Sequence, residues 1–304
     1  MAGQADAAEG GPVTVLSGSE WRESAAEHAE RVDTELADIL ARRDSGTAHP
    51  VDDFLFHYYS VRPAQLRVWH PGMGVDLMDA PEYADRRFYR VRENRAVLDV
   101  PAFLAQRGPT VDTAHTLLTA ALGQTPRFGC FGMHEWAMVL GLAQEQTRHP
   151  YLPLRFPPEE VSRIVEEVGC RCSHIDAFRF FTPAAKPLNL VQPTRERQAE
   201  FDQPGCLHVN MDLYKWAGKL SPAVSSELLF DTFVLARDIR VVDMQASAYD
   251  LTEWGLDPVR VETPEGRAEY ADVQKGFAER AQPLRRELVA VTQELITIRQ
   301  LVRS

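Results

Sequence analysis

The sequence has little cysteine, no long apolar run and no export signal, and each absence excludes a class of protein. Four cysteines among 304 residues, and a leader without a basic and then apolar segment, fit a reducing cytoplasm better than a disulfide framework. No uncharged apolar stretch reaches the roughly 18–20 residues of a membrane-spanning helix. Basic residues number 33 against 44 acidic ones, and the net charge of −11 argues against a protein that holds DNA by neutralising phosphates.

Several common signatures are also missing. The chain has no Walker loop, no H-E-x-x-H, no G-x-S-x-G and no dinucleotide-binding fingerprint. It shows no internal repeat and no low-complexity linker, and its hydrophobic fraction of 44% is ordinary for a folded chain. We therefore predict a flexible leader over residues 1–16. Residues 17–304 are predicted to form a single α+β domain that is mostly helical, with a small sheet and long C-terminal helices.

Apolar periodicity places the main elements. Ser19–Arg43 carries apolar side chains at helical spacing, and Ser17 with Glu20 predicts a capping box at the start of that helix. Arg86–Arg92 and Arg95–Val100 predict a β-hairpin. The other predicted elements are helices at 111–122, 130–142, 158–168, 194–203, 211–220, 225–238 and 265–303 (the last broken at Pro283), and strands at 170–181 and 239–244.

Cysteine and histidine gather in one quarter of the chain. Cys170, Cys172 and His174 are spaced two residues apart, as are Cys206 and His208. In a strand, residues at this spacing have their side chains on one face. Thiolate and imidazole are ligands that suit zinc or iron. The alternative is that the cysteines are small buried apolar residues and the histidines hydrogen-bonded core residues. The candidate metal ligands are His134, Cys170, Cys172, His174, Cys206 and His208.

Three carboxylates in the same segment are candidates for catalysis. Glu135, Asp176 and Asp212 each stand beside bulky apolar residues. Burial raises the pKa of a carboxyl group toward the range that general acid or base catalysis uses. The alternative is that each carboxylate caps a helix or pairs with a nearby arginine or lysine.

Aromatic and cationic residues are interleaved in this segment as well. Flat rings beside cations can stack on and orient a nucleobase or another planar ligand. Core packing accounts for such rings equally well. The residues that the first interpretation predicts to contact a substrate are Trp136, Phe178, Arg179, Asn210, Tyr214 and Lys215.

Three long motifs carry a resemblance to a known family. They are Phe128–Val139 (F-G-C-F-G-M-H-E-W-A-M-V), Cys172–Pro183 (C-S-H-I-D-A-F-R-F-F-T-P) and Gln203–Ala217 (Q-P-G-C-L-H-V-N-M-D-L-Y-K-W-A). With them the chain resembles, over nearly all of its length beyond the first 16 residues, a family from high-GC bacteria that is commonly labelled 3-methyladenine DNA glycosylase.

This resemblance implies hydrolysis of an N-glycosidic bond to a modified base, in DNA or in a nucleoside-like substrate. Such a reaction needs a base-stacking aromatic pocket and a carboxylate that stabilises the sugar cation or activates water. It implies that Trp136 and Tyr214 stack on the base, that Glu135 or Asp176 is the acid, and that no metal is needed.

Two alternatives remain at this point. One is a metal-dependent enzyme that acts on a small molecule, with the cysteine and histidine set holding zinc or iron. The other is a non-catalytic binding protein, whose first helix and tail would form a homodimer. Residues 1–50 hold ten acidic and four basic residues, whereas residues 130–216 hold eleven and nine. A local cationic pocket is therefore compatible with a small anionic substrate, while the net charge disfavours duplex DNA.

Overall fold

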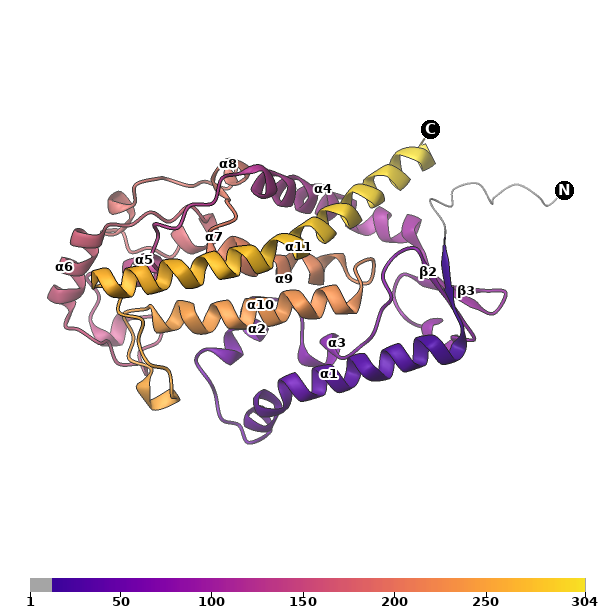
Figure 1. The fold of residues 1–304 in the computed structure, drawn as a ribbon, viewed down its shortest axis with the longest axis horizontal. Helices are drawn as coiled ribbons and strands as arrows, with labels where there is room; N and C mark the ends of the chain where they lie inside the picture. The colour runs from indigo at the N-terminus through magenta and orange to yellow at the C-terminus, as the bar shows by residue number, and fades with distance from the viewer. Residues whose placement is uncertain (1–12, 304) are drawn as a thin grey trace. The chain divides into compact units, whose positions relative to one another are not determined.

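The structure is a computed structural model that describes residues 13–303, and it confirms the α+β class (Figure 1). The chain is 59% helical, and its described part holds one four-stranded mixed sheet. The α-helices are α1 (Gly18–Asp44), α2 (Asp52–Tyr58), α3 (Pro63–Leu66), α4 (Val100–Gly123), α5 (Met133–Ala137), α6 (Pro158–Val168), α7 (Ile175–Phe178), α8 (Gln198–Phe201), α9 (Leu207–Leu220), α10 (Ser226–Gln245) and α11 (Pro264–Arg303). The strands are β1 (Thr14–Leu16), β2 (Val75–Met78), β3 (Tyr89–Arg92) and β4 (Arg95–Leu98).

The described residues form two compact units. Unit 1 comprises the chain up to Leu118, Tyr214–Phe233 and the chain from Leu284 onward, and unit 2 comprises Thr119–Leu213 and Val234–Pro283. The single domain over 17–304 stays a prediction. Of the predicted leader, residues 1–12 lie outside the described residues. Its last residues form β1, so the leader prediction is wrong there.

The sheet belongs to unit 1 and has the strand order β1-β2-β4-β3. Strand β1 pairs in parallel with β2, and the other neighbours are antiparallel. The predicted hairpin is confirmed as β3 and β4. Its turn residues, Glu93 and Asn94, have φ of 46° and 67°, which is the left-handed conformation that tight two-residue hairpin turns need.

Helix α1 begins with the predicted capping box. Ser17 Oγ accepts a hydrogen bond from the Glu20 amide, and the Glu20 carboxylate accepts one from the Ser17 amide at 2.8 Å. The apolar face of the helix is buried inside unit 1, where the Trp21 indole donates to Met78 O at 2.8 Å. This face is therefore occupied within the chain, and the predicted homodimer would need another surface.

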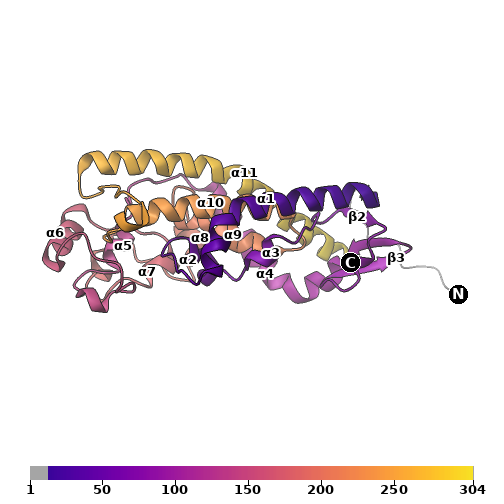
Figure 2. The same ribbon diagram turned by 90° about the horizontal axis from the view of Figure 1, so that it is seen from below.

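Two helices, α10 and α11, differ from the sequence-based prediction. The strand predicted at 239–244 is wrong, because these residues continue α10 to Gln245. The break predicted at Pro283 is also wrong, because α11 runs through this proline as one helix; a single proline removes one backbone hydrogen bond, which packing on both sides can offset. Within unit 2 the end of α10 and the start of α11 lie side by side (Figures 1 and 2), and Arg280 donates to Asp238 at 2.7 Å.

The segment that carries the predicted ligands is mostly irregular. The strand predicted at 170–181 is wrong: Cys170 makes one isolated bridge with Asn189, and α7 follows. The Asn189 side chain replaces a strand ladder, because its amide accepts from Cys172 N and donates to Cys172 O, both at 2.8 Å. Likewise, the helix predicted at 130–142 shortens to α5 and the one at 194–203 to α8.

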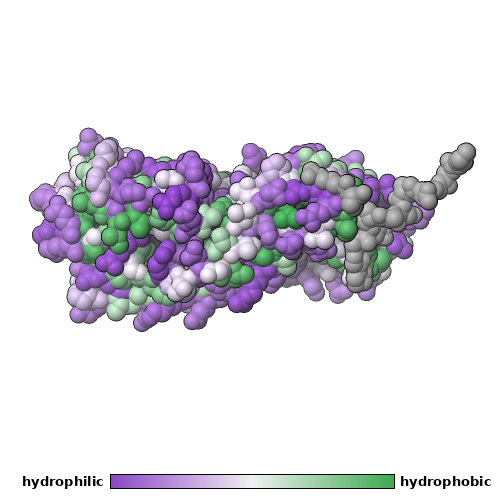
Figure 3. Space-filling model, turned by 90° about the horizontal axis from the view of Figure 1, so that it is seen from above, coloured by the Kyte–Doolittle hydropathy of each residue, from purple (hydrophilic) through white to green (hydrophobic). Residues whose placement is uncertain are grey.

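The side of the described chain that Figure 3 draws is mostly hydrophilic. On the side drawn in Figure 3, hydrophilic residues cover most of the area and hydrophobic ones stand in separate patches. The large hydrophobic side chains that are most exposed include Tyr151, Leu190 and Leu301. No helix among the described residues combines the length and the apolar character needed to cross a membrane.

Candidate metal centre

Two histidines and one aspartate of unit 2, each on a different helix, converge. His134 lies on α5, His208 in the first turn of α9, and Asp243 near the end of α10. One ligand atom from each residue lies within 4.8 Å of the other two. His134 Nε2 is 2.7 Å from Asp243 Oδ1, and His208 Nε2 is 4.0 Å from Asp243 Oδ2. These donor types are those that zinc and iron bind in proteins.

Arg240 of α10 forms two buried ion pairs, one with Glu135 of α5 and one with Asp243 of α10 itself. Arg240 Nη1 donates to Glu135 Oε1 at 3.0 Å and to Asp243 Oδ2 at 2.9 Å. Asp243 thus faces His134 with one oxygen and Arg240 with the other, and its side chain is fully buried. Because both oxygens have partners, the orientation of this carboxylate is fixed.

A glycine allows α5 to approach α10 so closely. Gly132, the residue before α5, has a φ of 69°, which costs glycine little. A Cβ at this position would lie 3.0 Å from the Ala246 Cβ, just beyond the end of α10. A larger residue would push the two segments apart and separate His134 from Asp243.

Burial and neighbouring charges set the protonation of the three residues. Burial lowers the pKa of His134, but the Asp243 carboxylate outweighs it and holds this pKa well above the usual value. Burial raises the pKa of Asp243, but His134 more than compensates, and the pKa lies below its usual value. Burial and the charge of His134 lower the pKa of His208 to about 3. His208 is therefore a neutral imidazole, the form that binds a metal ion, whereas His134 carries a proton in its ion pair with Asp243 and would release that proton when a cation binds.

A second histidine–aspartate pair adjoins the first. His174 Nε2 lies 3.3 Å from Asp212 Oδ2, and its ring stacks on that of His208 with centroids 5.4 Å apart. The Nδ1 atom of His174 is buried with no hydrogen-bond partner among the described residues. Asp176 would complete a second group of three ligands, but Arg195 binds its carboxylate. We place the centre at His134, His208 and Asp243, because His134 and His208 line a cavity whereas no member of the second group does.

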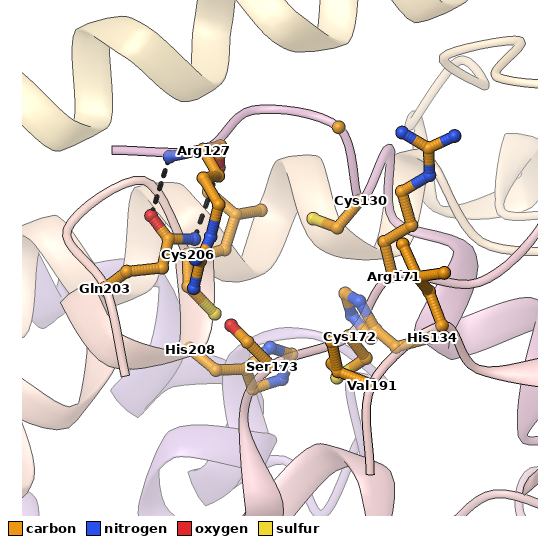
Figure 4. Close-up of a pocket in the computed structure, with 13 residues that line it drawn as sticks. Arg127, Cys130, His134, Arg171, Cys172, Ser173, Val191, Gln203, Cys206 and His208 are labelled. Atoms are coloured by element: carbon orange, nitrogen blue, oxygen red, sulfur yellow. Dashed lines mark hydrogen bonds between the residues drawn. The ribbon is translucent and has the colours of Figure 1, made fainter. Parts of the chain in front are cut away.

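A cavity of about 380 Å³ opens beside His134 and His208, and it lies wholly in unit 2 (Figure 4). Arg127 and Arg171 stand on opposite sides of it in Figure 4. Among the thirteen described residues that line the cavity, none is acidic. The other lining residues are Gly129, Cys130, Cys172, Ser173, Leu190, Val191, Gln203, Cys206 and Leu207. A ligand in the cavity can therefore contact both imidazoles.

The four cysteines are free thiols with different surroundings. Cys130, Cys172 and Cys206 line the cavity, whereas the Cys170 thiol faces a backbone carbonyl 3.9 Å away. Burial raises the pKa of Cys170 to about 11, raises that of Cys172 to about 12, and raises that of Cys206 well above its usual value. Burial also acts on Cys130, but the hydrogen bond and charge of His134, together with hydrogen bonds to Gly132 and Gln274, outweigh it and lower the pKa of that thiol. Because a thiol that keeps its proton is a poor metal ligand, the raised pKa values disfavour Cys170, Cys172 and Cys206 as ligands.

The three carboxylates predicted to be catalytic lie outside this lining. Each faces a cation or an imidazole: Glu135 with Arg240, Asp176 with Arg195, and Asp212 with His174. Burial raises the pKa of Glu135, although Arg240 opposes the shift. Their catalytic roles stay predictions.

The residues predicted to contact a substrate are also absent from the lining that the structure describes. Tyr214 and Lys215 belong to unit 1, and the other four belong to unit 2. Each of them has a partner elsewhere. The Trp136 indole and the Asn210 amide donate hydrogen bonds to Ala246 O and Pro204 O, and Arg179 forms an ion pair with Asp176. Phe178 packs against the ring of Phe181, Tyr214 packs against Tyr59 and Phe233, and the Lys215 ammonium lies over the ring of Trp216. Their substrate contacts stay untested.

Sequence reasoning missed Asp243 and Arg240. The reason is that we predicted a strand at 239–244. In a strand, the side chains of two residues three apart, such as Arg240 and Asp243, point to opposite faces. In a helix the same spacing puts them on one face. The signal was an arginine and an aspartate at i and i+3 within an apolar stretch, which is typical of a buried ion pair on a helix.

The donor set fits a divalent cation. Two ligands of one tetrahedral zinc ion lie about 3.3 Å apart for bonds of about 2.0–2.1 Å. His134 Nε2 and Asp243 Oδ1 are closer, at 2.7 Å, and His208 Nε2 is farther from the carboxylate, at 4.0 Å. Side-chain movements of about 0.5–1 Å would therefore accommodate the ion.

No family model, curated protein or solved structure matches the chain. The function is therefore inferred from the geometry around His134, His208 and Asp243. The likeness to the glycosylase-labelled family stays a prediction from the three motifs.

One prediction concerns the wall of the cavity. A Cβ at Gly205 would lie 2.6 Å from Arg127 O and 2.9 Å from Arg127 N. We expect Gly205→Ala to lower the free energy of unfolding by about 1–3 kcal/mol, because backbone atoms have to move. Urea denaturation measures this. Gly276→Ala in α11 is the matched control, since its Cβ meets nothing within 4 Å; a loss no larger than in the control would contradict the prediction.

Proposed function

We propose that the protein is a metal-dependent enzyme that acts on a small molecule, with His134, His208 and Asp243 as ligands of one divalent cation. The observation that carries this proposal is the convergence of two imidazoles and one carboxylate, all within 4.8 Å, beside a cavity. Two histidines and one carboxylate form the protein ligands of many catalytic zinc and non-haem iron sites, where the remaining positions serve water and substrate.

The surrounding residues support this role. A cation held here would supply a Lewis acid or an activated water. Asp243 binds from the buried side, while the His208 side chain is 14% exposed and lines the cavity. Arg240 orients the Asp243 carboxylate through its 2.9 Å hydrogen bond, and His174 holds the ring of His208 by stacking. The four free thiols support a reducing compartment, such as the predicted cytoplasm.

The resemblance to the glycosylase-labelled family implies cleavage of an N-glycosidic bond. The cavity volume of about 380 Å³ lies within the roughly 300–1,000 Å³ of small-molecule sites. An assay of base release from methylated DNA and from a methylated nucleoside tests this substrate. If a chelator and His208→Ala both abolish base release, the metal centre carries out the reaction. If neither changes base release, the metal centre takes no part in this reaction.

Cobalt(II) titration tests the centre itself, because the visible absorption of cobalt reports its ligands without any activity. We expect the wild-type protein to bind one cobalt ion. Loss of a ligand typically costs metal affinity far more than the roughly 10–100-fold that loss of an outer residue costs. His134→Ala and His208→Ala should therefore abolish the absorption. His57→Ala, which removes an exposed histidine of α2, is the matched control and should leave the titration unchanged; equal curves for His208→Ala and wild type would overturn the proposal.

A further inference from the structure

Two arginines line the cavity without a counter-charge. Arg127 and Arg171 are both exposed, and within residues 13–303 neither guanidinium forms an ion pair. Most arginines elsewhere in the described chain do pair, as Arg163 does with Glu160 and Glu167. Two unpaired guanidinium groups beside one cavity are therefore a feature to explain.

The backbone of Arg127 is held by a buried amide side chain. Gln203 Oε1 accepts from Arg127 N at 2.8 Å, and Gln203 Nε2 donates to Arg127 O at 3.2 Å (Figure 4). The same oxygen accepts from Gly205 N at 2.8 Å, and Gln274 Nε2 donates to Gly205 O at 2.5 Å. Gln203 is 4% exposed, so its hydrogen bonds are protected from water. The position from which Arg127 reaches the cavity is therefore fixed.

A second buried amide holds the segment that carries Arg171. Asn189 is 4% exposed and forms hydrogen bonds to both the N and the O of Cys172, the next residue. On its other side, Cys170 O accepts from Leu190 N at 2.9 Å. Arg171 thus stands between two fixed residues. Both arginines are presented by rigid backbone although both side chains are exposed, which is how proteins pre-organise a charged binding group.

The other residues that line the cavity indicate what kind of ligand the two arginines bind. Among the described residues of the lining there is no carboxylate, so nothing competes with an anion for Arg127 and Arg171. Leu190, which is 73% exposed, and Val191 add apolar surface at the same cavity. The chain as a whole is acidic, with a net charge of −11. A cationic cavity in an acidic protein selects small anions and repels long polyanions.

The geometry points to Arg127 and Arg171 as the recognition site for the anionic group of the substrate, a small organic carboxylate or phosphate ester with an apolar portion. This inference rests on the proposed function, because the same cavity is lined by His134 and His208. The guanidinium groups bind the anion by charge-assisted hydrogen bonds, and the bound molecule extends toward the metal ligands.

Isothermal titration calorimetry with benzoate and with phenyl phosphate tests the inference. The two probes share a phenyl ring and differ in the anionic group. The probe with the higher affinity therefore indicates whether the substrate carries a carboxylate or a phosphate. The variants are Arg127→Gln and Arg171→Gln. Arg92→Gln is the matched control, because Arg92 is an exposed arginine of β3 that does not line the cavity. Removal of a charged hydrogen-bond donor should weaken binding about tenfold or more in each cavity variant and leave the control unchanged.

Saturable binding of at least one probe that both cavity variants weaken, and the control does not, supports the inference. No saturable binding, or equal affinity in all variants, overturns it. Cobalt titration of Arg127→Gln and Arg171→Gln separates this failure from failure of the proposed function. Normal cobalt binding without anion binding overturns only the inference, whereas arginine-dependent anion binding without cobalt binding overturns only the metal centre.

Discussion

Replacement of Asp243 by asparagine is expected to lower the free energy of unfolding by about 3–5 kcal/mol. Asparagine keeps the shape of the side chain but removes its charge. The cation of Arg240, which is 2% exposed, then loses an acidic hydrogen-bond partner, and His134 loses the carboxylate that stabilises its charged form. A buried charge without its partner is far more costly than an ion pair lost at the surface.

Urea denaturation at neutral pH measures this loss. Asp238→Asn is the matched control, because Asp238 lies on the same helix and pairs with Arg280, but its side chain is 34% exposed. We expect the control to lose less than about 1 kcal/mol. If the two substitutions cost the same, Asp243 does not hold α5 and α10 together.

Added zinc is expected to stabilise the wild-type protein by about 2.7 kcal/mol when free zinc is one hundred times its dissociation constant, and by about 4 kcal/mol at one thousand times. The native state offers His134, His208 and Asp243 together, whereas the unfolded chain disperses them. Thermal unfolding at several zinc concentrations measures the effect.

His208→Ala should remove most of this stabilisation. His208 is a suitable position because its side chain is 14% exposed, so truncation disturbs the core less than at His134, whose side chain is 3% exposed. His57→Ala should keep the whole shift. A full zinc response in His208→Ala would show that zinc binds at another place on the chain.

Local signals account for the elements that the sequence predicts correctly. The capping box before α1, the turn between β3 and β4, and the acidic first turn of α6 are all set by residues close in sequence. The wrong predictions share the opposite property. Four of the six residues at 239–244 are apolar, and a short, mostly apolar run does not distinguish a buried strand from a buried helix such as α10.

The candidate site was predictable only in part. The crowding of cysteine and histidine in one quarter of the chain pointed to His134, His174 and His208, whose rings lie close together: the centroids are 4.6 Å apart for His134 and His208, and 5.4 Å for His174 and His208. Asp243 is 109 residues from His134 along the chain. Their contact depends on how α5 packs on α10, which no local pattern records.

The most direct test of the metal centre is elemental analysis of the protein as purified, beside His208→Ala and His57→Ala. We predict about one zinc or iron ion per chain in the wild type and in His57→Ala, and little metal in His208→Ala. Substoichiometric metal in the wild type, or the same metal content in His208→Ala, would contradict the assignment of His134, His208 and Asp243 as a metal centre.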